Sequence, residues 1–135
     1  MGGELLGPDV QIDGASIDSR SVRPGQLFVP IVAERDGHDF IKSALDGGAT
    51  AYLSSRVDPV GGTAIRVADT ALALADLGRA VRARVPDRVV GITGSVGKTS
   101  TKDLLAGVLR TTYRTAASEK SFNNELGLPI TLAAA

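Results

Sequence analysis

The 135-residue chain contains no cysteine and no tryptophan, and it has a single histidine. Without cysteine, neither disulfide bonds nor thiolate metal sites can form, and an intracellular location is allowed. Fifteen basic and fifteen acidic side chains give a formal net charge of +0, so charge offers no reason to expect a nucleic-acid partner. No apolar run approaches the roughly 20 residues of a membrane span, and the amino terminus lacks a basic segment followed by an apolar one. We expect a cytoplasmic protein that does not insert into membranes.

The composition is that of a folded globular protein, because 43% of the residues are hydrophobic. This length can bury one ordinary core or two small ones. The order of strand-like and helix-like segments predicts the α/β class. We expect a small mixed α/β domain over residues 1–86, and the first strand, phosphate loop and helix of an incomplete nucleotide-binding domain over residues 87–135.

The most informative stretch is RVVGITGSVGKTSTKDLLAGVL, residues 88–109. It predicts a buried strand over 89–92, a glycine-rich turn, and an amphipathic helix that follows directly. Such a turn lets backbone N–H groups surround a phosphate, while the helix dipole and Lys98 add positive charge. An ordinary tight turn would explain the glycines but not Gly97, Lys98 and Thr99 together. The residues predicted to bind nucleotide are Gly94, Ser95, Val96, Gly97, Lys98, Thr99 and Ser100.

The first 86 residues carry the pattern of a small sheet with helices. Residues 1–8 read as an irregular lead-in, and alternation predicts strand over 10–17, with a bulge or a hairpin turn at Asp13-Gly14. Further strands are predicted at 26–32, 49–53 and 63–67. Helices are predicted at 39–45 and from Asp69 or Thr70 to about residue 85, where Pro86-Asp87 marks the expected domain boundary.

Two polar groups in this part have open interpretations. Asp18-Ser19-Arg20 follows a predicted strand and is either a solvated turn or a site where Ser19 and Arg20 contact a carbonyl or phosphate. His38 has few partners for a metal site, although Asp36 and Asp39 are near in sequence. A capping or ligand-orienting role for His38 is favoured.

The end of the chain contains fewer elements than a nucleotide-binding domain needs. A strand is possible at 113–116, but one strand-helix unit cannot bury both faces of a parallel sheet. The carboxylate that completes a phosphate-loop magnesium site has no candidate here. We expect the front part of a longer protein, or a shortened form of it.

Three stretches together resemble the Mur ligases, ATP-dependent amide-forming enzymes of peptidoglycan precursor synthesis. They are IDSRSVRPGQLFVPI followed by DGHDFIKSALDGGATAYL, GITGSVGKTSTKD, and SFNNELGLPITL. The last stretch, with Asn123-Asn124, is similar to the branch that adds D-alanyl-D-alanine. The resemblance therefore covers nearly the whole chain.

The resemblance implies a set of ligands and roles. ATP and Mg²⁺ would bind at the phosphate loop, with Lys98 as catalytic residue and the Thr99 hydroxyl on the metal. The small-molecule substrates would be UDP-N-acetylmuramoyl tripeptide and D-alanyl-D-alanine, and the fragment alone is expected to be inactive. The residues implied to contact the UDP-linked substrate are Ser19, Arg20, His38, Asn123 and Asn124.

Other functions share some of these features. Another Mur ligase or a folylpolyglutamate-type ligase would use the same ATP loop, but the Asn123-Asn124 segment argues against both. A non-catalytic nucleotide-binding module is the alternative from a different class. A GTPase would need an Asn-Lys-x-Asp segment, which the chain does not contain.

Overall fold

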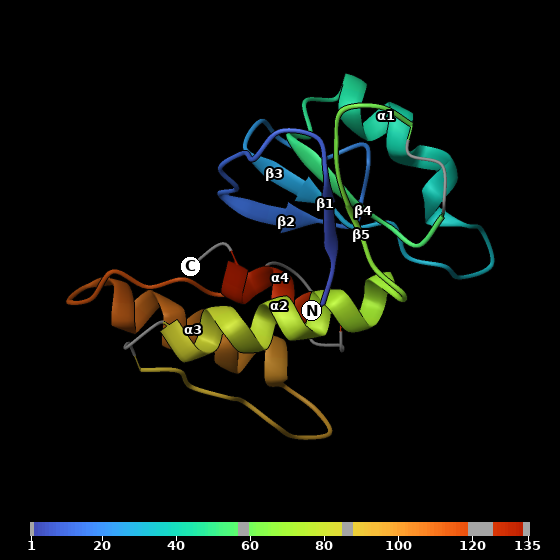
Figure 1. Ribbon diagram of the computed structural model, residues 1–135. Coiled ribbons are helices and arrows are strands. Elements are labelled where there is room, and N and C mark those ends of the chain that lie inside the picture. The colour runs from blue at the N-terminus through green and yellow to red at the C-terminus, as the bar shows by residue number, and fades with distance from the viewer. Residues whose placement is uncertain (1, 57–59, 85–87, 119–125, 134–135) are drawn as a thin grey trace.

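A computed structural model describes residues 2–56, 60–84, 88–118 and 126–133. Within these ranges the chain forms a mixed sheet with helices on both sides (Figure 1). The elements are β1 (Glu4–Leu6), β2 (Gly14–Ser16), β3 (Gln26–Phe28), the 3₁₀ helix η1 (Gly37–Phe40), α1 (Ile41–Asp46), β4 (Ala51–Ser54), β5 (Thr63–Arg66), α2 (Thr70–Arg84), α3 (Lys98–Arg110) and α4 (Gly127–Ala133).

The sheet has the strand order β1-β5-β4-β3-β2. Strands β2, β3, β4 and β5 run parallel to one another, and β1 pairs antiparallel with β5 at the edge. The carboxyl ends of four strands therefore meet at one edge of the sheet, where open α/β sheets bind their ligands.

Alternating side chains along the central strands build two apolar layers. In β4, Tyr52 belongs to the cluster under α1, while Ala51 and Leu53 belong to the cluster under α2. Phe28 and Leu27 of β3 divide in the same way. The result is a sheet covered on both faces, with α1 on one side and α2 and α4 on the other (Figure 1).

Helix α4 joins the last described segment to the first part of the chain. It packs along α2 and against β2, and Ile130 and Ala133 contact the apolar cluster of the sheet. Gly78 of α2 makes this contact possible, because a Cβ atom there would lie 2.8 Å from Cβ of Pro129. The sequence pattern does not predict α4.

The α/β class and most expected elements are confirmed. The helices predicted at 39–45 and from residue 69 or 70 are present, and Asp69 caps the second by accepting a hydrogen bond from the Leu72 amide at 2.9 Å. The strands predicted at 26–32, 49–53 and 63–67 form as the shorter β3, β4 and β5. The predicted helix after the phosphate loop is α3.

Four expectations are wrong. The lead-in contains β1, whose partner β5 is about 60 residues away in sequence, beyond the reach of a local pattern. Gly14 is the first residue of β2, which pairs with β3 in parallel and in regular register, so Asp13-Gly14 forms neither a hairpin turn nor a bulge within the strand. Residues 89–92 and 113–116 are not strands, because no described segment offers them a hydrogen-bonding partner.

Candidate functional site

The phosphate loop leads into the amino terminus of α3 through Gly97, whose φ of 81° lies in the left-handed region. Gly94 also has positive φ, at 153°. These conformations are unfavourable for side chains with a Cβ atom, which explains the glycines of the motif at these two positions. The fold therefore forms the sharp turn that the motif predicts.

The first turn of α3 leaves backbone donors available. The Thr101 amide donates to the Gly97 carbonyl at 2.9 Å, which is the first hydrogen bond of the helix ladder. No side chain caps the helix, so within the described residues the amides of Lys98, Thr99 and Ser100 have no intrahelical acceptor. Three N–H groups at the positive end of a helix dipole form a site for an anion.

Lys98 stands at this helix start and folds back over the turn. Its Nζ donates a hydrogen bond to the Gly94 carbonyl at 2.5 Å. A phosphate at the helix terminus would offer the ammonium a charged acceptor in place of a neutral carbonyl, and hydrogen bonds between charged groups are stronger. The turn, the amides and Lys98 thus form one anion-binding arrangement.

The second candidate region lies at the carboxyl edge of the sheet, after β2. Asp18 accepts hydrogen bonds from Nε and Nη2 of Arg20, both at 2.9 Å. The guanidinium and the Arg20 amide lower the pKa of the Asp18 carboxyl, and the carboxylate in turn raises the pKa of Arg20. The Arg20 side chain is 86% exposed, so an anionic ligand can reach it.

His38 lies in η1 and is buried, with 2% exposure. Its Nδ1 lies 2.6 Å from Oδ1 of Asp36, and its Nε2 accepts a hydrogen bond from the Ser55 amide at 3.0 Å. The ring therefore links the loop before α1 to the residue that follows β4.

Asp36 is the charged centre of this small network. It also caps η1 and pairs with Arg56 at 2.8 Å. Hydrogen bonds from the His38 amide, the His38 ring and Arg56 hold the pKa of the Asp36 carboxyl far below its usual value. The carboxylate keeps a proton on Nδ1 of His38, which leaves Nε2 as an acceptor.

The Ser55 hydroxyl lies 3.1 Å from Nε2 of His38, so the order of groups is that of a Ser-His-Asp triad. The same lone pair of Nε2 already accepts the Ser55 amide. A nitrogen occupied in this way is a poor base for the hydroxyl proton. The arrangement therefore orients the chain after β4 and does not activate a nucleophile.

The topology brings the two polar groups to one edge. Residues 17–20 follow β2, and Ser55, which binds His38, follows β4, with β3 between them. Two strand spacings place these groups roughly 10 Å apart. Asn123 and Asn124 lie outside the described residues, so the structure does not locate them relative to this edge.

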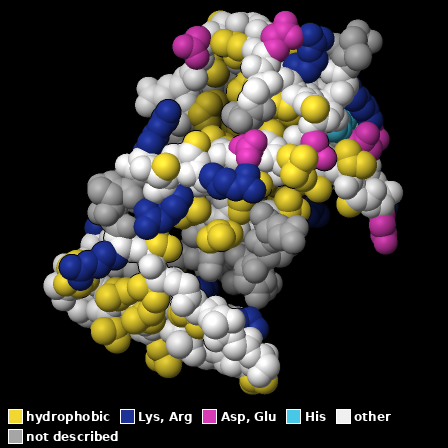
Figure 2. All heavy atoms as spheres, turned by 60° about the horizontal axis from the view of Figure 1, so that its bottom comes forward, with side chains coloured by type: hydrophobic (Ala, Val, Ile, Leu, Met, Phe, Trp, Pro, Cys, Tyr) yellow, Lys and Arg dark blue, Asp and Glu magenta, His cyan; other side chains and the backbone are white. Residues whose placement is uncertain are grey.

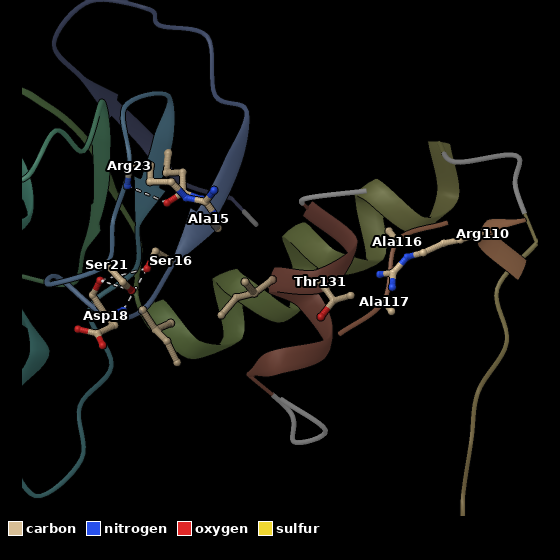
Figure 3. A pocket seen from close by; sticks show the side chains of 12 residues that line it. Ala15, Ser16, Asp18, Ser21, Arg23, Arg110, Ala116, Ala117 and Thr131 are labelled. Atoms are coloured by element: carbon tan, nitrogen blue, oxygen red, sulfur yellow. Dashed lines mark hydrogen bonds between the residues drawn. The ribbon is translucent and has the colours of Figure 1, made fainter. Parts of the chain in front are cut away.

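A cleft of about 450 Å³ begins at the end of β2. Asp18 and Ser21 lie on its sheet side, Arg110, Ala116 and Ala117 lie on the opposite side, and Thr131 of α4 lies between them (Figure 3). The segment that follows β2 and the segment that follows α3 thus form walls of the same cleft. The sequence does not predict Arg110 or Thr131 as lining residues, because the contact depends on α4.

Other classes of site are not evident in this part of the chain. The described residues contain no cluster of three or more His, Cys, Asp or Glu side chains that could hold a metal ion. None of the helices in the described ranges has the length and apolar character needed to cross a bilayer.

The sequence does not predict the contacts of Ser55 with His38 or of Arg56 with Asp36, whereas the Asp-x-His spacing at 36–38 is a local signal for the contact between Asp36 and His38.

A glycine-rich turn that presents backbone donors at a helix start, joined to an α/β sheet covered on both faces, is typical of nucleotide-binding proteins. Two family models match in tandem: "Mur ligase family, catalytic domain" over residues 11–87 and "Mur ligase middle domain" over residues 92–135. The first match alone covers more than half of the chain. The chain belongs to the Mur ligase family.

Curated relatives share one name. The UDP-N-acetylmuramoyl-tripeptide--D-alanyl-D-alanine ligase of Escherichia coli (strain K12) is 43% identical over 133 residues, which cover 98% of this chain and 29% of the relative. The ligase of the same name from Bacillus subtilis (strain 168) is 40% identical over 139 residues, 98% of this chain and 30% of the relative. The chain thus spans about 30% of the length of these relatives.

Solved structures agree in fold. A structure of UDP-N-acetylmuramoylalanyl-D-glutamyl-2,6-diaminopimelate--D-alanyl-D-alanyl ligase from Acinetobacter baumannii superposes with a TM-score of 0.84 at 30% identity. It covers 98% of this chain and 31% of that one. MurF ligase from Thermotoga maritima in complex with ADP has a TM-score of 0.71 at 35% identity, covering 89% of this chain and 28% of that one.

Proposed function

We propose that this chain forms the UDP-substrate-binding part, and the beginning of the ATP-binding part, of a ligase that adds D-alanyl-D-alanine to UDP-N-acetylmuramoyl tripeptide. The domain division at residues 86 and 87 and the individual site residues are part of the proposal. Two features support it together: backbone donors at the start of α3 that suit a phosphate, and a cleft whose walls come from both parts of the chain. The names of the curated relatives supply the substrates.

The phosphate loop is assigned to ATP. Lys98, as the catalytic residue, would neutralise charge on the transferred γ-phosphoryl group, and the amides at the start of α3 would hold the phosphate oxygens. That the T. maritima relative was solved in complex with ADP supports nucleotide binding by this chain.

A magnesium ion fits the donors at the loop only together with the phosphates. The Thr99 hydroxyl is exposed in the first turn of α3 and would be a protein ligand, with Ser100 beside it. Mg²⁺ binds through few protein oxygens and shares phosphate oxygens, so one hydroxyl is a reasonable contribution. The ion would neutralise phosphate charge.

The edge of the sheet is assigned to the UDP-linked substrate. Arg20 can exchange its contact with Asp18 for a phosphate of the ligand, and Ser19 adds a hydroxyl in the same turn. His38 would act by holding the chain after β4 in place, since both ring nitrogens bind protein atoms. Asn123 and Asn124 remain predicted contacts.

The proposed reaction proceeds in two steps. The terminal carboxylate of the tripeptide attacks the γ-phosphorus of ATP, which forms an acyl phosphate and releases ADP. The amino group of D-alanyl-D-alanine then attacks the acyl carbon, forms the amide and releases phosphate. The dipeptide-binding and remaining ATP-binding groups are not assigned to these residues, so we expect the 135-residue chain to bind ligands without ligating them.

The assignment is tested by phosphate release from the full-length protein that carries this chain. UDP-N-acetylmuramoyl tripeptide, ATP and Mg²⁺ are supplied with and without D-alanyl-D-alanine. We expect sustained phosphate release only when the dipeptide is present. A rate of phosphate release that is the same with and without the dipeptide would reject this ligase activity.

Replacing Lys98 separates the two proposed sites. Lys98→Ala should lower nucleotide affinity and reduce turnover at least 100-fold, by roughly 3 kcal/mol or more of transition-state stabilisation. Binding of the UDP-linked substrate should change little, and Lys42→Ala on α1 is the matched control. Equal loss of both affinities, measured by calorimetry, would mean that the two sites are misplaced.

A further inference from the structure

Lys102 is a partly buried lysine of α3 that lies outside the residues predicted to bind nucleotide. Its side chain is 20% exposed. The Nζ atom donates to the Ser118 carbonyl at 2.6 Å and lies 2.9 Å from Oδ1 of Asp103. A lysine held in this way loses much of its rotamer freedom. Its hydrogen bond therefore restrains the distance between α3 and the segment that contains Ser118.

Lys98 and Lys102 are four residues apart on α3, so they lie on the same side of the helix. Each ammonium group binds a backbone carbonyl of a neighbouring segment: Lys98 that of Gly94 in the phosphate loop, and Lys102 that of Ser118. The helix rise between them is only about 6 Å. One rigid turn of α3 therefore connects the phosphate loop to the segment that follows the helix.

The segment that follows the helix, residues 114–118, is joined to α3 by the hydrogen bond from Lys102 to the Ser118 carbonyl. Within the described residues, Thr115 makes a local hydrogen bond to the Tyr113 carbonyl. Ala116 and Ala117 of this segment line the cleft opposite Asp18 and Ser21 (Figure 3).

We propose that Lys102 is a positioning residue that couples the phosphate loop to the wall of the cleft. This inference rests on the proposed function, because it takes the loop as the nucleotide site and the cleft as the UDP-substrate site. A nucleotide that binds the amides of Lys98 and Thr99 shifts or stiffens the first turn of α3. Lys102 transmits that change to residues 116–118 in the wall of the cleft. The affinity of the cleft for the UDP-linked substrate changes as a result.

The first experiment needs no UDP-linked substrate. Amide hydrogen exchange of residues 114–118 is measured in the 135-residue chain with and without ADP and Mg²⁺. We expect ADP to slow exchange there about fivefold or more in the original chain, and to have no effect there in Lys102→Met, which keeps the length of the side chain but lacks the donors. Lys42→Met on the exposed face of α1 is the matched control and should behave as the original chain does.

A conservative variant separates positioning from simple stability. Lys102→Arg retains donors at a similar reach and should restore part of the ADP effect at residues 114–118. If ADP binds the original chain but leaves exchange at these residues unchanged, the coupling is wrong. If Lys102→Met responds to ADP as the original chain does, it is equally wrong. Should Lys102→Met not fold, the comparison of the original chain with and without ADP decides alone.

The second experiment measures coupling as a ratio of affinities. The Kd of UDP-N-acetylmuramoyl tripeptide is determined in the presence and absence of saturating ADP, and the ratio is expected to differ from one by about fivefold or more. In Lys102→Met the ratio should approach one. A structural role alone would alter both Kd values and leave their ratio unchanged. Failure of the original chain to bind ADP or the UDP-linked substrate would instead reject the proposed function, and the coupling with it.

Discussion

The sheet with its covering helices α1 and α2, here called the sheet unit (residues 2–84), buries most of its large apolar side chains, whereas the segment over residues 88–118 exposes several of them. In the apolar core between the sheet and α2, Leu53, Val29 and Leu74 are fully buried, with 0% exposure. In the other segment, Val90, Leu104 and Val108 are 61%, 73% and 67% exposed, and hydrophobic side chains gather on the face that carries α3 (Figure 2). A periodic pattern of apolar residues therefore leads to burial only where another element of the described chain packs against them.

The two regions also differ in how many of their polar groups have hydrogen-bond partners within the protein. Among the described residues no buried side-chain polar atom lacks a hydrogen-bond partner, and the His38 ring shows how completely the sheet unit satisfies its own groups. The start of α3 leaves three amides without an intrahelical acceptor. The buried polar groups of the first region stabilise its fold, whereas the start of α3 presents backbone groups that a ligand can satisfy.

The largest test of this contrast compares two leucine truncations. Leu53→Ala should lower the free energy of unfolding by about 2–5 kcal/mol, because it leaves a cavity in the closed core. Leu104→Ala on α3 should change it by less than about 0.5 kcal/mol, because the side chain is already in water. Urea denaturation of the 135-residue chain measures both, and equal losses would contradict the contrast.

A smaller effect is expected from two glycines in helices. Gly78→Ala in α2 places a methyl group against Pro129 and should destabilise the chain by about 1–3 kcal/mol through overpacking. Gly107→Ala in α3 meets no atom within 4 Å and should stabilise by up to about 1 kcal/mol through helix propensity. The two substitutions share their chemistry, so thermal midpoints that shift in the same direction would show that α4 does not pack closely on α2.

The smallest effect concerns charge in the sheet unit. Asp36→Asn keeps the shape of the side chain but weakens its hydrogen bonds to His38 and Arg56, which should cost about 1 kcal/mol at neutral pH. The folded pKa of Asp36 is depressed, so the stability it supplies is present above its unfolded pKa of about 3.9 and is lost as pH falls below that.

The stability difference between the original chain and Asp36→Asn should therefore be constant above about pH 5 and shrink toward pH 3. Urea midpoints at pH 7, 5 and 3 measure it. Because the other carboxyl groups are common to both proteins, their titration cancels. If the stability difference does not change with pH, the contribution of Asp36 to stability does not come from its negative charge.

The sequence predicted elements whose signals are local. The α2 helix has a cap at Asp69 and an apolar face, and the glycines of the phosphate loop occupy conformations that side chains disfavour. Strand β1 and helix α4 were not predicted, because β1 is defined by pairing with β5 and α4 by packing on α2. The strand expected over 89–92 carries a correct apolar pattern but no described partner.

The candidate site divides along the same line. The glycine-rich turn before α3 was predictable, since the residues that form it are neighbours in the chain. The cleft was not, since its walls at Asp18 and Ala116 are about 100 residues apart in sequence. Nor was Lys102, whose role depends on which carbonyl its ammonium group meets.

By itself, the sequence determined the backbone chemistry of the phosphate loop, because glycine at positions 94 and 97 and lysine at 98 act within one turn. Only the tertiary structure decided what that loop can influence. A hydrogen bond from Lys102 and the packing of Pro129 on Gly78 bring distant segments to one cleft. Contacts of this kind depend on close approach between elements, and a local pattern of residue types carries no information about it.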